Sequence, residues 1–140
     1  MAEISFTIPL APRGQARARS TVVNGHARTY KAAKQRLAEE SLAALIAPHC
    51  PPEPWTGAVE LYMRAFLPIP RSWSRKKRTA ALAGQILPTV KPDLDNTLKH
   101  LKDVLSGMVY RDDRQITDIK AGKRYGDPPR WEVIVREVSA

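Results

Sequence analysis

The chain has 140 residues, a length that fits one compact domain able to bury a hydrophobic core. Hydrophobic residues make up 43% and charged residues 26%, as in ordinary globular proteins, but the net charge of +9 and the pI of about 10.1 are unusual. This excess of lysine and arginine favours a polyanionic partner, most often nucleic acid and less often an anionic membrane surface.

The same sequence argues against several classes of protein. No apolar run approaches the roughly 20 residues of a membrane span, and residues 1–12 lack the basic start and long apolar stretch of a secretory signal. Cys50 is the only cysteine, so no intrachain disulfide can form, and the three histidines are too scattered to build a zinc site with it. We therefore expect a cytoplasmic protein without a membrane partner.

The N-terminal part predicts a strand followed by a basic loop. Residues 4–8 alternate apolar and polar side chains, the period of two that is typical of a half-buried strand. The polar stretch that follows places Arg13, Arg17 and Arg19 between small residues. It predicts a basic loop that is closed by a turn at residues 24–25.

A helix and a second strand are predicted next. Apolar residues recur at helical spacing from residue 30 to residue 47, with Thr29 as a possible N-cap. The proline-rich stretch "PHCPPEP" cannot continue this helix. Residues 59–67 alternate cleanly again, which places Val59 and every second residue after it on one face of a strand.

The second half predicts two helices and then two strands. The first helix begins after Ser72 or Ser74, and the second runs from about residue 94 to residue 106 before Gly107, a natural stop. The buried stripe of the second helix is predicted to consist of Leu94, Leu98, Leu101 and Leu105. The last two strands flank a turn at residues 126–129, and this spacing suggests a hairpin.

The order of these elements indicates the fold class. Strand, helix, strand, two helices, strand and strand are typical of an α+β protein. We predict a single domain over residues 1–140, with helices packed on a mixed or antiparallel sheet of about four strands.

The charges are segregated along the chain. No acidic residue lies between Glu3 and Glu39, or between Glu60 and Asp93. These gaps contain the basic loop and the run "RSWSRKKR", whereas a short acidic region contains Asp93, Asp95, Asp103, Asp112, Asp113 and Asp118. A basic surface around one acidic region suggests phosphate binding beside a cation site.

The basic run has two interpretations. It can be a solvated turn, the usual role of so short a run. If Ser72 or Ser74 caps a helix, however, the cations that follow crowd its positive end, where each is unfavourable by a few tenths of a kcal/mol. An external anion explains that placement more easily than solvation does.

The stretch "KPDLDNTLKHLKDVL" contains the candidate catalytic residues. Asp93 and Asp95 lie two residues apart in an extended segment, so their side chains project from the same side. Lys99 follows Asp95 by one helical turn and can reach the same place. Carboxylates of this kind suit Mg²⁺ or Mn²⁺, and either Asp112 or Asp113 could add a third ligand at the entrance to the next strand.

A purely structural interpretation fits the same residues. Asp93 or Asp95 could cap the helix, and Lys99 could bridge Asp95 and Asp103 for a few tenths of a kcal/mol. The pair of aspartates at residues 112–113 could form a plain turn. The spacing alone leaves both interpretations open.

A family resemblance adds what the spacing does not show. The segment "KPDLDNTLKHLKDVLSGMVYRDDRQITDIKAGKRYG" is similar to the central motif of the RusA family of Holliday junction resolvases, many of them carried by phages and prophages. The segment "PIPRSWSRKKRTAALAGQILPTVKPDLDN" resembles the lead-in of one branch of that family. The resemblance extends from about residue 4 to residue 138, and it departs from the family at "APRGQARAR", where members often have P-x-S-x-N.

The resemblance implies an activity and roles for particular residues. The metal-binding carboxylates of the family correspond to Asp93, Asp95 and Asp113, and its essential lysine corresponds to Lys99. The implied function is that of a homodimer that binds four-way DNA junctions and, with Mg²⁺ or Mn²⁺, nicks two opposing strands symmetrically in recombination and repair. We expect DNA contacts from Arg13, Arg17, Arg19, Arg71, Arg75, Lys76, Lys77 and Arg78.

Two matters stay open in the sequence. The alternative function is a catalytically silent basic DNA-binding module whose acidic region is structural. The dimer interface could be the apolar strand face through Val59 or the C-terminal strands around Trp131 and Val133, and the sequence does not choose between them.

Overall fold

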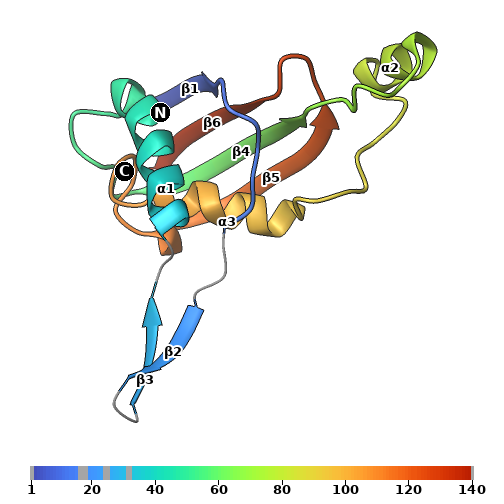
Figure 1. Ribbon diagram of the computed structural model, residues 1–140. Coiled ribbons are helices and arrows are strands. Elements are labelled where there is room, and N and C mark those ends of the chain that lie inside the picture. The colour runs from blue at the N-terminus through green and yellow to red at the C-terminus, as the bar shows by residue number, and fades with distance from the viewer. Residues whose placement is uncertain (1, 16–18, 24–25, 31–32, 140) are drawn as a thin grey trace.

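The computed structural model describes residues 2–15, 19–23, 26–30 and 33–139. Figure 1 shows a sheet with helices on one face and a separate two-stranded ribbon that extends away from it. The elements are β1 (Ala2–Ile8), β2 (Arg19–Val23), β3 (His26–Tyr30), α1 (Ala33–Ile46), β4 (Ala58–Leu67), α2 (Arg75–Leu82), α3 (Leu94–Leu105), β5 (Ile116–Tyr125) and β6 (Arg130–Ser139), with short 3-10 helices η1 (Ala47–His49) and η2 (Asp113–Gln115).

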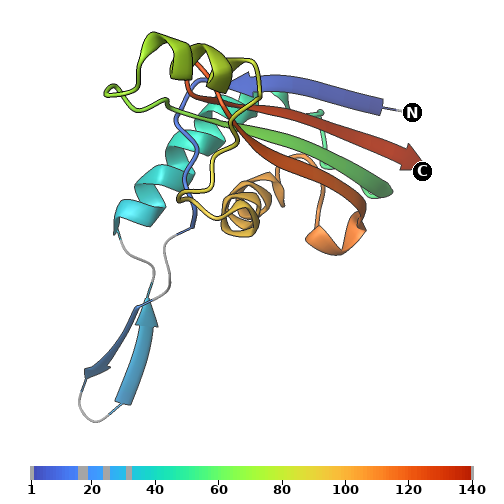
Figure 2. The ribbon, with the colours of Figure 1, turned by 90° about the vertical axis from the view of Figure 1, so that its right-hand side faces the viewer.

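The main sheet confirms the predicted fold class. Its four strands follow the order β1-β6-β4-β5. β6 runs antiparallel to both β1 and β4, whereas β4 and β5 run parallel, so the sheet is mixed. In Figure 2, α1 and α3 lie on the same side of this sheet. The molecule is therefore an α+β domain with its core between one sheet face and two helices.

The predicted hairpin of the last two strands is wrong, because β4 lies between β5 and β6. The alternating apolar side chains of β4 are at most 3% exposed, and a strand with so apolar a face is best buried in the middle of the sheet. The connection from β5 to β6 crosses the end of β4, where the Gly126 N–H donates to the Leu67 carbonyl at 2.9 Å. A Cβ on Gly126 would lie 2.6 Å from Phe66 Cβ, so the crossing requires glycine.

The predicted apolar stripe of α3 faces the core, but its four leucines are not buried equally. Leu101 and Leu105 are fully buried, whereas Leu94 and Leu98 are half-buried at the edge of the core. The buried His100 also faces inward, and its Nδ1 lies 3.1 Å from the Gln35 side-chain nitrogen on α1. Burial of the pair requires such a hydrogen bond, which ties α1 to α3.

The start of α1 corrects the sequence prediction. The helix begins at Ala33, and Thr29, the predicted N-cap, belongs to β3. The supposed loop before it contains two antiparallel strands, in which Val23 pairs with His26. The predicted turn at residues 24–25 lies outside the described residues. In the described part of the chain, no helix has the length and apolarity needed to cross a bilayer.

Both apolar faces that the sequence offered for dimerisation belong to the core. Val59 is fully buried, and Trp131 and Val133 are each 1% exposed. They face the helices that cover the sheet, because these strand positions supply the apolar surface on which α1 and α3 pack. Neither face is therefore available to a partner chain.

Candidate functional site

The start of α3 presents two exposed carboxylates. Asp93 occupies the N-cap position, but its side chain makes no capping hydrogen bond to the helix. Within the part of the chain that the structure describes, the Asp95 Oδ1 atom accepts only from the neighbouring Asn96 N–H, at 2.9 Å. The proposed capping role therefore does not account for Asp93, and the structure leaves carboxylate oxygens of both residues accessible to solvent.

Neighbouring residues hold the backbone of this segment in place. The Lys123 Nζ atom on β5 donates to the carbonyls of Val90 and Pro92 at 2.8 and 3.0 Å. The Thr97 hydroxyl donates to the Asp93 carbonyl at 2.9 Å. All of these contacts use main-chain oxygens, so they position the two aspartates without neutralising them.

Gln15 fastens the chain before the two-stranded ribbon to α3. The Asn96 side chain donates to the Gln15 carbonyl at 3.0 Å, and the Gln15 side chain donates to the Asp103 carboxylate. The Asn96 side chain therefore anchors a distant segment to the start of α3. Asp103 is exposed on the surface.

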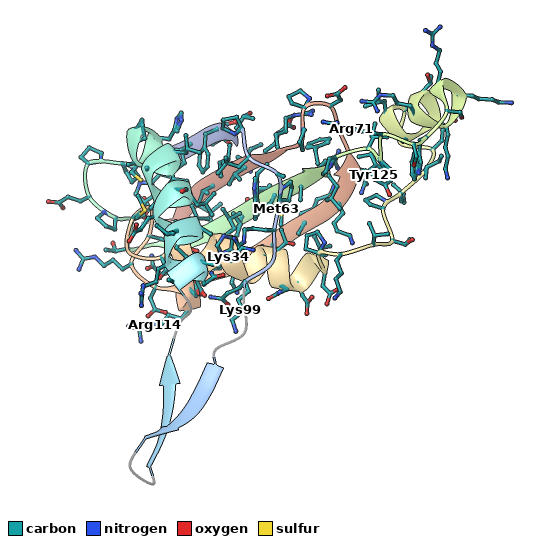
Figure 3. All side chains as sticks on the ribbon, in the orientation of Figure 1. Lys34, Met63, Arg71, Lys99, Arg114 and Tyr125 are labelled. Carbon is teal, nitrogen blue, oxygen red and sulfur yellow. The ribbon has the colours of Figure 1, made fainter. Side chains whose placement is uncertain are left out.

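Lys99 is exposed one turn after Asp95, and Figure 3 shows it pointing away from the sheet. Side chains at this spacing lie on the same helix face. The structure has no ion pair between Lys99 and either Asp95 or Asp103, although all three residues are described. The interpretation of Lys99 as a bridge within the helix therefore has no support, and its ammonium group remains available to an external anion.

Asp113 lies at the opposite end of α3. A helix of 12 residues is about 18 Å long, and the Gly107 N–H just beyond its end donates to the Tyr110 carbonyl at 2.7 Å. The Tyr110 hydroxyl in turn donates to Asp113 Oδ1 at 3.1 Å. In Figure 3, Arg114 lies beyond this end, far from Arg71.

The three predicted metal ligands thus do not meet within one chain. Asp93 immediately precedes α3 and Asp95 lies in its first turn, whereas Asp113 follows the end of the helix. Among the described residues, no group of three or more histidine, cysteine, aspartate or glutamate side chains could hold a metal ion.

Asp112 and Asp113 make different contacts, because a short 3-10 helix precedes the strand that follows them. Asp113 begins the 3-10 helix η2, and Asp112 caps it by accepting from the Arg114 N–H at 2.9 Å. Asp113 is instead held by the buried Tyr110. Burial of Tyr110, together with the nearby Asp113 charge, raises the pKa of its phenol well above the usual range, so Tyr110 remains a neutral donor to Asp113.

The carboxylate pair fits a magnesium ion by the chemistry of its donors. Mg²⁺ prefers hard oxygen ligands, and proteins often hold it through one or two carboxylates, with waters and substrate phosphates completing its shell. Asp93 and Asp95 are exposed, close in sequence and not engaged in capping. They suit a site that a phosphate ligand completes.

The predicted DNA-binding residues are distributed over several elements. Ser74 caps α2 by accepting from the Lys77 N–H at 3.2 Å, so α2 does begin with a run of cations and has no acidic residue in its first turn. Arg71, Arg75 and Lys76 are exposed.

The other predicted contacts have different surroundings. Lys77 lies over the Trp73 ring, and Arg78 pairs with Asp127 at 2.9 Å. Arg13 is half-buried, Arg17 lies outside the described residues, and Arg19 belongs to β2.

Sequence reasoning missed three residues that organise the site. Lys123, Gln15 and Tyr110 position the catalytic candidates through contacts with distant parts of the chain. No local pattern marks Lys123 or Gln15. The sequence did contain a signal for Tyr110, because the hydroxyl of a tyrosine shortly before two aspartates can donate a hydrogen bond to one of them.

Comparisons with known proteins show the family of this chain. Residues 9–136 match the family described as Endodeoxyribonuclease RusA. The chain is also 38% identical over 139 residues to "Uncharacterized protein YqaN" of Bacillus subtilis (strain 168), an alignment that covers 98% of each chain.

Proposed function

Because the chain belongs to the RusA family of endodeoxyribonucleases, we propose that it is a divalent-metal-dependent nuclease that resolves four-way DNA junctions by paired symmetric nicks in recombination and repair. The observation that carries the proposal is the exposed Asp93–Asp95 pair, which the helix start does not use, with Lys99 one turn away. The net charge of +9 supplies the attraction to a polyanion.

Each of these residues has a task in phosphodiester hydrolysis. Asp93 and Asp95 would hold Mg²⁺ or Mn²⁺, which supplies charge neutralisation at the phosphate and a bound water of lowered pKa. Lys99 contacts the scissile phosphate or orients the attacking water, because its ammonium group is exposed on the same face as Asp95. Lys123 keeps the two aspartates in position by fixing the turn that precedes them.

The basic start of α2 gives the DNA a second contact. In Figure 1, α2 and the start of α3 both lie toward the end of the sheet where β4 and β5 finish. Cations at the positive end of a helix are unfavourable in isolation, and a phosphate bound there offsets that cost. A duplex arm that reaches the carboxylate pair can therefore also contact α2.

Lys99→Ala is expected to lower the cleavage rate about a hundredfold while changing junction affinity only a few-fold. One phosphate contact is a small part of binding, but a charge placed at the reacting phosphate is a large part of transition-state stabilisation. Single-turnover cleavage and gel shift on the same preparation measure the two effects. Lys34→Ala removes an equally exposed charge from α1 and serves as the control; an equal loss in both variants would contradict the role of Lys99.

Replacement of Arg75 and Lys76 by alanine together is expected to weaken binding more than turnover. Each lost phosphate contact reduces the slope of log K against log salt by about 0.9. Arg78→Ala is the matched control, because Arg78 already pairs with Asp127 and should change the slope less. An unchanged slope in the double variant would show that α2 does not contact DNA.

Asp113→Asn is expected to abolish cleavage, whereas Asp112→Asn should be mild. Asparagine caps a helix about as well as aspartate, so Asp112→Asn preserves the cap of η2. At Asp113 the amide oxygen still accepts from Tyr110, but the charge is lost. Cleavage rate and thermal unfolding of both variants test this difference, and equal loss of cleavage would refute it.

The alternative function is a silent DNA-binding module with a structural acidic region. Incubation with a four-way junction and with linear duplex of the same sequence, in Mg²⁺ and in EDTA, separates the two functions. The nuclease cuts the junction in Mg²⁺ alone. A silent module binds the junction in both conditions and cuts nothing.

A further inference from the structure

We propose that the open face of the sheet, opposite α1 and α3, binds the phosphate backbone of a second duplex arm of the junction. The contact is centred on a pocket over Gly122, with Arg64, Lys120 and Arg124 as the phosphate-binding residues. The inference rests on the proposed function in taking branched DNA as the ligand. It adds a binding surface that lies apart from the carboxylate pair.

The two faces of the sheet differ in what covers them. In the described part of the chain, α1 and α3 lie on one side of the sheet (Figure 2). Leu61 and Met63 of β4 are buried beneath these helices, whereas Arg64 points to the other face and is exposed. This open face contains a pocket of about 360 Å³ between β4, β5 and β6, a volume within the range of ligand-binding pockets.

Three cations surround a glycine in this pocket. Gly122 of β5 pairs directly with Arg64 of β4. Lys120 and Arg124 lie two residues before and two residues after this glycine, so their side chains share its face of the sheet. Diagonal neighbours on a sheet are about 7–8 Å apart, so the long side chains of all three cations can reach one anion. Like charges so close together are unfavourable unless an anion lies between them.

The charges of these three residues are not compensated within the described part of the chain. The side chains of Arg64 and Lys120 form no hydrogen bond or ion pair with any described residue. Arg124 donates to the main-chain carbonyl of the residue before it, at 2.7 Å, which leaves its charge intact. Glu132, a carboxylate that lines the pocket, is paired with Arg130 at 3.0 Å. The pocket therefore has an excess of positive charge and suits a phosphate.

Gly122 keeps the pocket open. A Cβ at this position would lie 3.2 Å from the Arg124 Nη1 atom, so a larger residue would press on the guanidinium and fill the hollow. Glycine in the interior of a strand weakens the sheet, and it often marks a place where a ligand approaches the backbone closely. The position of this glycine among three cations fits that role.

The aromatic rings of the open face favour contacts with the DNA backbone over contacts with unpaired bases. Arg130 lies 4.0 Å from the centroid of the Phe66 ring, and Arg136 lies 5.6 Å from that of Tyr62. Surfaces that bind single strands use uncovered aromatic rings, on which the bases stack. Because arginines already cover these two rings, the face suits the phosphates of duplex DNA.

The pocket and the carboxylate pair lie on opposite faces of the same stretch of β5. Lys123, which fixes the turn before Asp93, lies next to Gly122 in the strand and points to the helix-covered face. Duplex DNA is stiff, with a persistence length of about 150 bp, so one duplex would have to bend sharply to contact both faces. A junction offers several arms. The pocket therefore takes an arm other than the one that reaches Asp93.

Removal of two charges tests this surface in EDTA, where cleavage should be absent. The variant R64Q/K120Q should lower the slope of log K against log salt for the junction by about 1.8, at about 0.9 for each phosphate contact. Linear duplex can use either face, so its affinity should change only about twofold, and the ratio of junction to duplex affinity should fall roughly tenfold or more. Both residues lie on the open face outside the core, so the variant should unfold at the wild-type temperature.

The matched control keeps both charges at the same positions. R64K/K120R should retain the slope and the junction preference of the wild type, because each phosphate still meets a cation. If R64Q/K120Q binds the junction with an unchanged slope, or loses affinity equally for junction and duplex, the contact with a second arm is wrong.

Protection of lysines in the wild-type protein gives a second measurement that needs no variant. Acetylation followed by mass spectrometry should modify Lys120 several-fold more slowly in the complex with a junction than in the free protein. Lys34, which is exposed on α1, should react at an unchanged rate. A Lys120 that reacts equally fast with and without the junction would overturn the inference.

The outcomes separate this inference from the proposed function. If the wild type cuts the junction but R64Q/K120Q keeps the wild-type slope, the open face does not bind DNA and the nuclease function stands. If R64Q/K120Q loses the junction preference but even the wild type cuts no DNA in Mg²⁺, the second binding surface stands and the nuclease function fails.

Discussion

Asp95→Asn is expected to abolish cleavage of four-way junctions while leaving junction binding intact or slightly tighter. The change removes a metal-binding charge but no cationic group that contacts phosphate. Loss of even an outer-shell partner of a metal costs about 10–100-fold, so loss of a direct ligand should exceed a hundredfold. Among the described residues, the Asp95 carboxylate contacts only the neighbouring Asn96 N–H, and the variant should therefore fold normally.

Cleavage and gel shift on one preparation test this expectation. Glu40→Gln removes an equally exposed charge from α1 and controls for the change in net charge. If a folded Asp95→Asn protein cleaves at the normal rate, the assignment of the metal site to the start of α3 is wrong.

Leu101→Ala is expected to lower the free energy of unfolding by about 2–5 kcal/mol. Leu101 is fully buried in the middle of α3, and its truncation leaves a cavity between this helix and the sheet. Because α3 positions both the carboxylate pair and Lys99, the variant should also lose activity on warming before the wild type does.

Leu82 provides the matched control for this experiment. It is 50% exposed at the end of α2, so Leu82→Ala should change the free energy of unfolding by less than about 0.5 kcal/mol. Urea unfolding of both variants measures the difference. Equal stability of the two variants would show that α3 is not anchored as described.

The sequence predicted correctly those elements that depend on side chains close together in the chain. The alternation of β4, the apolar stripe of α3 and the cap by Ser74 could all be predicted, because each follows from side chains close in sequence. The two strands of the ribbon were mistaken for a loop. Their polar, basic composition carries no apolar alternation, so only the pairing of one with the other reveals them.

Arrangement in space was harder to predict. The short turn between β5 and β6 is compatible with a hairpin. The two strands do not pair, however, because the apolar strand β4 lies between them. The assignment of a metal site to Asp93 and Asp95 stays a prediction. The sequence analysis expected a third carboxylate at the same site, but the predicted helix could have shown that Asp113 lies away from it, since a helix between two residues separates them by its length.

Cleavage of a supercoiled plasmid that extrudes a cruciform is the most direct test of the central claim. The account predicts that the protein in Mg²⁺ converts the plasmid to the linear form, because two symmetric nicks fall on opposing strands of one junction. A plasmid without the cruciform should stay intact, and EDTA should stop the reaction. Intact cruciform plasmid in Mg²⁺, or equal cutting of both plasmids, would contradict a junction-resolving nuclease.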